Sequence, residues 1–132
     1  MLVPEDMRFT TEHEWMKWEG SNLRMGITDY AQDALGDVVY VSLPSADARY
    51  ESGGTLGEVE STKSVSEIYA PVNGMVISIN DRLSENPELI NEDPYGDGWI
   101  CLIAPDDIEG YEELLERDDY ITLTHDETPR AF

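Results

Sequence analysis

The chain has 132 residues, 40% of them hydrophobic, which predicts a globular domain and argues against a disordered acidic chain. Eight Lys and Arg against 29 Asp and Glu give a net charge of −21, which disfavours nucleic acid and anionic membrane surfaces as partners. The acidic residues are spread along the chain and lysine is nearly absent. We therefore interpret the charge as a surface adapted to a high-salt cytosol, in preference to recognition of basic partners.

The first part of the chain predicts a hairpin, a short helix and a strand. A turn signal at residues 20–22 separates two apolar runs that can pair. Thr28 or Asp29 can cap a helix that ends at Gly36, and Pro44 ends the β-branched strand that follows. The expected strands are residues 7–18, 23–27 and 38–43, and residues 44–54 are expected to form a surface loop.

Further short strands are expected in the middle of the chain, joined by turns and a loop. Met75, Ile77 and Ile79 share one face of an alternating strand. Residues 71–74 form a turn by their chemistry, and residues 84–98 carry Pro and Gly and form a long loop. The expected strands are residues 55–60, 64–70, 75–80 and 99–104.

The C-terminal part predicts one substantial helix. Residues 106–117 have acids in the first turn and apolar residues at helical spacing, whereas the tail at residues 118–132 is expected to be strand-like or loose. Many short strands with Gly and Pro turns predict a mainly β sandwich or flattened barrel with a helical appendage. We expect a single domain over residues 1–132, with its core at about residues 8–104.

The cysteine count and the N-terminus bear on the compartment. Cys101 is the only cysteine, so no intrachain disulfide is possible. It lies in an apolar run, which predicts a buried structural thiol. Residues 1–6 lack the basic and apolar regions of a signal peptide, and no stretch is long enough to cross a membrane. We therefore expect a cytoplasmic protein without membrane contact.

Lys63 is the candidate for chemistry. The small and polar residues 60–64 separate two predicted strands and place Lys63 at a hairpin tip, with Gly53 ten residues before it and Gly74 eleven residues after it. An exposed amine on a rigid turn among small neighbours suits enzymatic acylation, which removes its charge and leaves a long chain. The spacing alone fits a solvated lysine without a function equally well.

Seven segments of the sequence occur in an order typical of a known family. They are residues 11–15, 25–32, 35–41, 58–63, 68–74, 89–91 and 93–99. Together they resemble the H proteins of the glycine cleavage system, which are lipoyl carriers of the biotinyl/lipoyl domain superfamily. The resemblance covers about residues 8–117, and the run at residues 26–32 is not a feature of ordinary lipoyl domains.

This resemblance implies a fold, a cofactor and partners. The fold is a mainly β barrel-sandwich hybrid with short helices and a C-terminal helix, and lipoate is attached to Lys63. The arm would carry an aminomethyl group from glycine decarboxylase to aminomethyltransferase, and dihydrolipoyl dehydrogenase would reoxidise its dithiol. A lipoate-attaching enzyme would modify the lysine. The chain itself is expected to be a monomeric, non-catalytic carrier without a metal.

The resemblance also places His13 and Glu14 at a cleft that shelters the loaded arm from water. Glu14 could pair with the aminomethyl cation through a charge-assisted hydrogen bond, or it could be one solvated acid among 29. His13 could equally be a structural histidine. Glu12, where the family often has Ser or Lys, adds negative charge near this cleft.

Alternatives to this function differ in what they require of Lys63. An H-like lipoyl scaffold for lipoate relay or another complex keeps the lysine and changes the partners. A biotin carrier usually has Met on both sides of its lysine, whereas Thr62 and Ser64 stand here. The family usually has Val and Ala at these two positions. An enzyme with a Schiff-base lysine needs a desolvated or cationic environment, and the nearby Glu60 and Glu67 offer the reverse.

Overall fold

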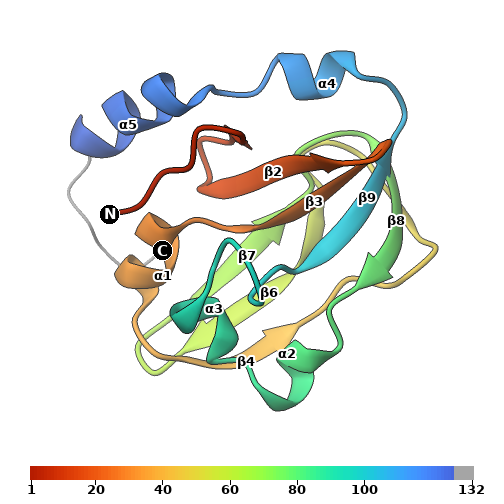
Figure 1. Cartoon of the computed structure of the whole chain (residues 1–132). Helices are drawn as coiled ribbons and strands as arrows, with labels where there is room; N and C mark the ends of the chain where they lie inside the picture. The colour runs from red at the N-terminus through yellow and green to blue at the C-terminus, as the bar shows by residue number, and fades with distance from the viewer. Residues whose placement is uncertain (127–132) are drawn as a thin grey trace.

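Two antiparallel sheets form the fold in the computed structural model, which describes residues 1–126 (Figure 1). The larger sheet has the strand order β1–β2–β3–β9–β8–β5, and the smaller has the order β4–β6–β7. The larger sheet consists of β1 (Arg8–Phe9), β2 (Glu14–Glu19), β3 (Asn22–Ile27), β5 (Arg49–Tyr50), β8 (Gly74–Ile79) and β9 (Cys101–Pro105). The smaller sheet consists of β4 (Val38–Ser42), β6 (Thr55–Ser61) and β7 (Val65–Tyr69).

Short helices connect and cover these strands. They are α1 (Asp29–Leu35), α2 (Arg82–Glu85), α3 (Leu89–Glu92), α4 (Glu109–Glu112) and α5 (Arg117–Asp126). The predicted mainly β class with short helices and a C-terminal helix is therefore confirmed. Within residues 1–126, no helix is long and apolar enough to cross a membrane.

Local sequence signals produce the β2–β3 hairpin and α1 as predicted, whereas the single strand expected over residues 7–18 is divided into β1 and β2 by a turn at residues 10–13. Strands β2 and β3 pair from Glu14 opposite Ile27 to the turn at residues 20–21. The side-chain oxygen of Thr28 caps α1 by accepting a hydrogen bond from the Ala31 amide at 3.1 Å. Gly36 ends the helix with a φ of +85°, which glycine adopts without steric cost.

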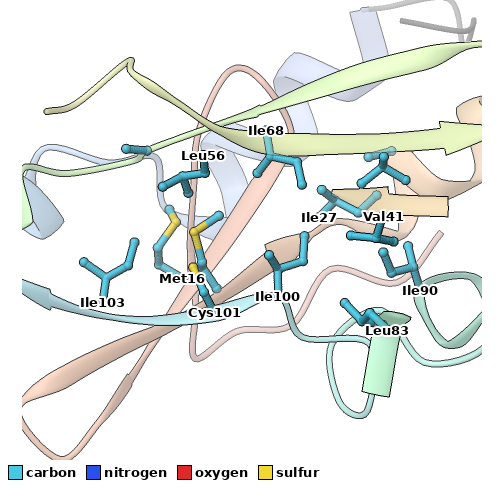
Figure 2. Close-up of a cluster of buried hydrophobic side chains, with 14 of the residues drawn as sticks. Met16, Ile27, Val41, Leu56, Ile68, Leu83, Ile90, Ile100, Cys101 and Ile103 are labelled. Atoms are coloured by element: carbon cyan, nitrogen blue, oxygen red, sulfur yellow. The ribbon is translucent and has the colours of Figure 1, made fainter. Parts of the chain in front are cut away.

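The main core lies between the two sheets, and α2 and α3 close one side of it (Figure 2). Each fully buried aliphatic side chain contributes about 1.5–3 kcal/mol to folding. Members with 0–2% exposure include Met16, Leu23, Val59, Ile68, Val76, Leu83, Ile90, Ile100 and Ile103. Cys101 is also fully buried there, and burial raises the pKa of its thiol to about 12, so the predicted structural cysteine is confirmed.

A second, smaller core joins the N-terminal segment to the C-terminal helix. Its buried members are Val3, Met7, Phe9, Trp15 and Tyr120. Figure 1 shows the N-terminal segment and α5 together on the side of the molecule that carries α1. This second core therefore sits against β1 and β2, apart from the main core between the sheets.

Strand β8 departs from its predicted alternation because of a bulge. The pairing with β9 shifts register between Val76 and Ser78, so Ile77 does not continue the face of its neighbours. Val76 is fully buried, whereas Ile77 is 38% exposed. The expectation that Met75, Ile77 and Ile79 form one continuous face is therefore wrong.

The C-terminal helix lies later in the chain than predicted. Within residues 106–116 only the short α4 forms, and α5 begins at Arg117 and occupies the first part of the tail that was expected to be strand-like or loose. Leu115 pairs with Phe9 in an isolated bridge with both backbone hydrogen bonds at 2.8 Å, so the chain is extended there. This long-range pairing overrides the local helical pattern. Residues 127–132 of the predicted tail lie outside the described residues.

Acidic side chains face one another on the smaller sheet. Glu58 on β6 is directly opposite Glu67 on β7, and both side chains are exposed. Like charges in such a pair destabilise a sheet, and dissolved salt screens their repulsion.

We expect the melting temperature to fall by about 5 °C or more when KCl is lowered from molar to millimolar concentration, because the net charge of −21 is then unscreened. Thermal unfolding at both salt levels measures this. Glu58→Gln should reduce the difference in melting temperature between the two salt levels. Thr62→Ser, a neutral change at an exposed position, should leave that difference unchanged. Equal melting temperatures at both salt levels would contradict the salt-adapted interpretation of the surface.

Candidate functional site

Lys63 lies at the tip of the β6–β7 hairpin with an exposed side chain, where the sequence places it. Ser61 holds the turn, because its hydroxyl oxygen accepts hydrogen bonds from the amides of Lys63 at 3.2 Å and Ser64 at 3.1 Å. The Thr62 amide donates to the Asp37 carbonyl at 3.1 Å and ties the tip to the start of β4. The backbone of Lys63 is therefore held in place while its side chain is exposed.

The stem of Lys63 passes over the end of α1. A Cβ atom placed on Gly36 would lie 3.4 Å from the Cε atom of Lys63, which is van der Waals contact distance, so the stem lies directly against this glycine. Asn91 on α3 clamps this surface, with its Nδ2 donating to Gln32 Oε1 and to the Gly36 carbonyl, both at 2.9 Å. Its Oδ1 accepts from the Val38 amide at 2.8 Å. One amide side chain thus joins α1 to β4 beneath the lysine.

Glu14 lies at the opposite end of β7 from Lys63 and is only 2% exposed. Its Oε1 accepts a hydrogen bond from the Thr10 hydroxyl at 2.7 Å, and its Oε2 accepts one from the Tyr69 amide at 2.9 Å. Desolvation raises the pKa of Glu14 to about 7, against these two hydrogen bonds, which lower it. Glu12 raises the pKa slightly further. Near neutral pH this carboxyl group therefore gains or loses a proton readily.

His13 lies behind Glu14, in the interior. It is 5% exposed and adopts a φ of +70°. Its Nδ1 is hydrogen-bonded to the Tyr120 hydroxyl at 2.8 Å, and its ring packs on Tyr30 with centroids 4.6 Å apart. The structure thus brings the two predicted residues together, but it places only Glu14 on the surface of the adjoining hollow.

Two hollows lie along β7, and one of them reaches Glu14. The smaller, of about 350 Å³, is lined by Glu12, Val65, Ser66, Glu67 and Tyr69 and so begins two residues after Lys63. The next, of about 460 Å³, also includes Glu12 and Tyr69 and reaches Glu14. They adjoin through these shared residues and form a track along β7. A further hollow of about 570 Å³ between α1 and α5 shares no lining residue with either.

Several residues that build this site were not singled out from the sequence. Ser61 and Asn91 lie within the ordered family segments, and a serine at a hairpin turn is a signal for a side-chain-to-backbone bond. Nothing local indicated Tyr120, which comes from the C-terminal helix. Among residues 1–126, no group of three or more His, Cys, Asp or Glu side chains is placed to hold a metal ion.

A family model described as "Glycine cleavage H-protein" matches residues 7–127. A "Glycine cleavage system H protein" from Anaeromyxobacter sp. (strain K) is 53% identical over 116 residues, which are 88% of this chain and 91% of that protein. A "Probable glycine cleavage system H protein" from Haloarcula marismortui is 48% identical over 118 residues, 89% and 93% of the two chains. The crystal structure of a glycine cleavage system H protein from Mycobacterium marinum is similar with a TM-score of 0.85 and 36% identity, covering 93% of this chain and 99% of that one.

The raised pKa of Glu14 predicts a pH-dependent stability. Between the ordinary value of 4.5 and about 7, the folded state keeps a proton that the unfolded state releases, so stability falls as pH rises through this window. Glu14→Gln removes this titration. Relative to wild type, the variant should gain about 2–3 kcal/mol between about pH 5 and about pH 8, measured by urea unfolding at each pH. A difference that is the same at both pH values would show that Glu14 titrates normally.

Proposed function

The chain belongs to the glycine cleavage H-protein family and is a lipoyl carrier of the glycine cleavage system, and we propose that Lys63 is the residue that bears the lipoyl group. The observation that carries this assignment is the exposed amine of Lys63 on a turn held rigid by Ser61. Lys17 is the only other lysine in the sequence, and its ammonium group pairs with Asp6 at 3.0 Å.

The surroundings of Lys63 suit a long acyl chain. The stem lies over Gly36, and the hollows along β7 begin at Val65, two residues after Lys63. When attached, a lipoyl group would supply a disulfide that takes up an aminomethyl group on one sulfur and is left as a dithiol, still on the lysine, once that group has been transferred. The residues of this chain would then hold the root of the arm, guide it along β7 and shelter its end.

Glu14 is the residue we assign to the sheltered end of the track. A cationic amine brought beside its desolvated carboxyl group would favour the ionised form and lower its pKa from about 7. The resulting charge-assisted hydrogen bond holds the cargo in a place with little water. The hydrogen bonds from Thr10 and Tyr69 keep the carboxyl group pointed at this position.

We propose that the enzymes of the cycle act on this arm and that the chain contributes no catalytic residue of its own. The expected partners are glycine decarboxylase, aminomethyltransferase and dihydrolipoyl dehydrogenase, together with a lipoate-attaching enzyme. An exposed root on a fixed turn supports this division, because the arm has to enter several different active sites in turn. Loading by glycine decarboxylase separates this role from that of a lipoate-relay scaffold.

Intact mass spectrometry of the protein from its native host tests the attachment residue. Wild type should carry one lipoyl increment, Lys63→Arg should carry none, and Lys17→Arg should be modified as wild type, because only Lys63 stands on the hairpin tip. An unmodified wild-type chain, or a Lys63→Arg protein that keeps the increment, would refute the assignment.

The proposed shelter predicts how fast the cargo is lost. The protein is loaded with radioactive glycine by glycine decarboxylase and then separated from the enzyme, and release of label is followed. Glu14→Ala should release label about tenfold faster than wild type, because it removes one charge-assisted contact of about 1.5 kcal/mol. Glu19→Ala, which removes an exposed carboxylate from the same strand, is the matched control. Equal rates in all three proteins would remove Glu14 from this role.

A further inference from the structure

The C-terminal helix reaches the interior through Tyr120. This side chain is fully buried, and its ring stacks on Phe9 with centroids 4.7 Å apart and planes inclined by 13°. The hydroxyl group extends past Phe9 to the start of β2. It is therefore placed where the second core meets the loop that precedes Glu14.

The Tyr120 hydroxyl bridges two segments that are separate in sequence. It is hydrogen-bonded to Nδ1 of His13 at 2.8 Å and to the Thr28 side-chain oxygen at 2.7 Å. Thr28 is the N-cap of α1, and its backbone amide donates to the His13 carbonyl at 3.0 Å. One hydroxyl group thus fixes both the loop before Glu14 and the beginning of α1.

The fixed backbone of His13 sets the direction of Glu14. A φ of +70° lies in the left-handed region, which histidine visits more often than most residues other than glycine, asparagine and aspartate. The turn is closed by the His13 amide, which donates to the Thr10 carbonyl at 3.2 Å, and the contacts of the His13 ring with Tyr120 and Tyr30 hold the side chain of this residue in the interior. If His13 relaxed, the next residue would turn, and the Glu14 carboxyl group would lose its position beside the Tyr69 amide.

The same hydroxyl group acts toward the root of the arm through α1. This helix begins at the cap formed by Thr28 and ends at Gly36, which lies under the stem of Lys63. The helix spans only seven residues, so a short element separates the cap formed by Thr28 from Gly36. The root and the resting place of the arm therefore share one anchor.

We infer that Tyr120 is a positioning residue, whose hydroxyl group holds the His13 backbone and the N-terminus of α1 so that Glu14 faces the resting place of the carried group. The inference rests on the proposed function of Glu14. The C-terminal helix then acts on the resting place indirectly, because Tyr120 on this helix holds His13, which precedes Glu14. Tyr120 itself does not line the hollows beside Glu14.

The first test uses the unmodified full-length chain and titrates Glu14 by NMR of labelled carboxyl carbons. Tyr120→Phe keeps the stacked ring and removes the hydroxyl group, so the pKa of Glu14 should fall by about one unit or more as water reaches it. Tyr95→Phe is the matched control, because its hydroxyl group also bonds at the start of α1, to the Asp29 amide at 3.0 Å and the Leu2 carbonyl at 2.7 Å. It should leave the titration of Glu14 unchanged, although both variants melt at lower temperature than wild type.

The second test follows release of label from the loaded protein. Tyr120→Phe should release it at least fivefold faster than wild type, and Tyr95→Phe at the wild-type rate. His13→Gly keeps access to positive φ and removes the ring on which Tyr120 acts, so it should reproduce the Tyr120→Phe result and serves as a substitute if that variant fails to fold.

The outcomes separate this inference from the proposed function. Wild-type titration of Glu14 in Tyr120→Phe, or equal changes in Tyr120→Phe and Tyr95→Phe, would overturn the positioning role. If Glu14→Ala releases label at the wild-type rate, the sheltering function fails, whereas the titration of the unmodified chain still decides whether Tyr120 positions Glu14.

Discussion

The buried carboxyl group of Glu14 joins the two sheets beside the hollow that we propose as the resting place of the carried group. It sits at the start of β2 in the larger sheet and accepts a hydrogen bond from the Tyr69 amide at the end of β7 in the smaller one. Burial makes the ionised form costly, and the pKa near 7 records that cost. The main core supplies the stability that this desolvated acid gives up. Such a trade between stability and function is common at working sites.

Hydrogen bonds fix the structure at both ends of β7, the strand along which the two hollows lie. At one end, Ser61 fixes the turn that carries Lys63, and Asn91 fixes Gly36, against which the stem of Lys63 lies. At the other, Thr10 and Tyr69 hold Glu14. This combination supports the proposed function, because a mobile chain on a fixed root samples a limited space. The short α1 lies between the two, with its N-cap Thr28 hydrogen-bonded to the His13 carbonyl and its C-cap Gly36 against the stem of Lys63.

The acidic surface has a consequence inside the site as well as outside it. Glu12 raises the pKa of Glu14, and Glu67 lines the track and accepts a hydrogen bond from the Tyr69 hydroxyl at 2.8 Å. Negative charge along this path favours a cationic group over a neutral or anionic one.

Ser64 stands where the family usually has alanine, and this difference has a small effect on stability. Its hydroxyl oxygen is buried without a hydrogen-bond partner among the described residues, a cost that the alanine usual in the family would avoid.

The sequence alone determined the hairpin of β2 and β3, the helix capped by Thr28 and Gly36, and the place of Lys63 at the tip of the β6–β7 hairpin, because turns and caps depend on neighbouring residues. The ordered segments also indicated the family. Only the tertiary structure decided the burial of Glu14, the bulge in β8 and the position of the C-terminal helix. Each of these arises from contacts between distant parts of the chain. Leu115 pairs with Phe9, and Tyr120 reaches His13. Local sequence patterns cannot predict such contacts, because the free energy that favours each contact is gained only when the distant segments pack together.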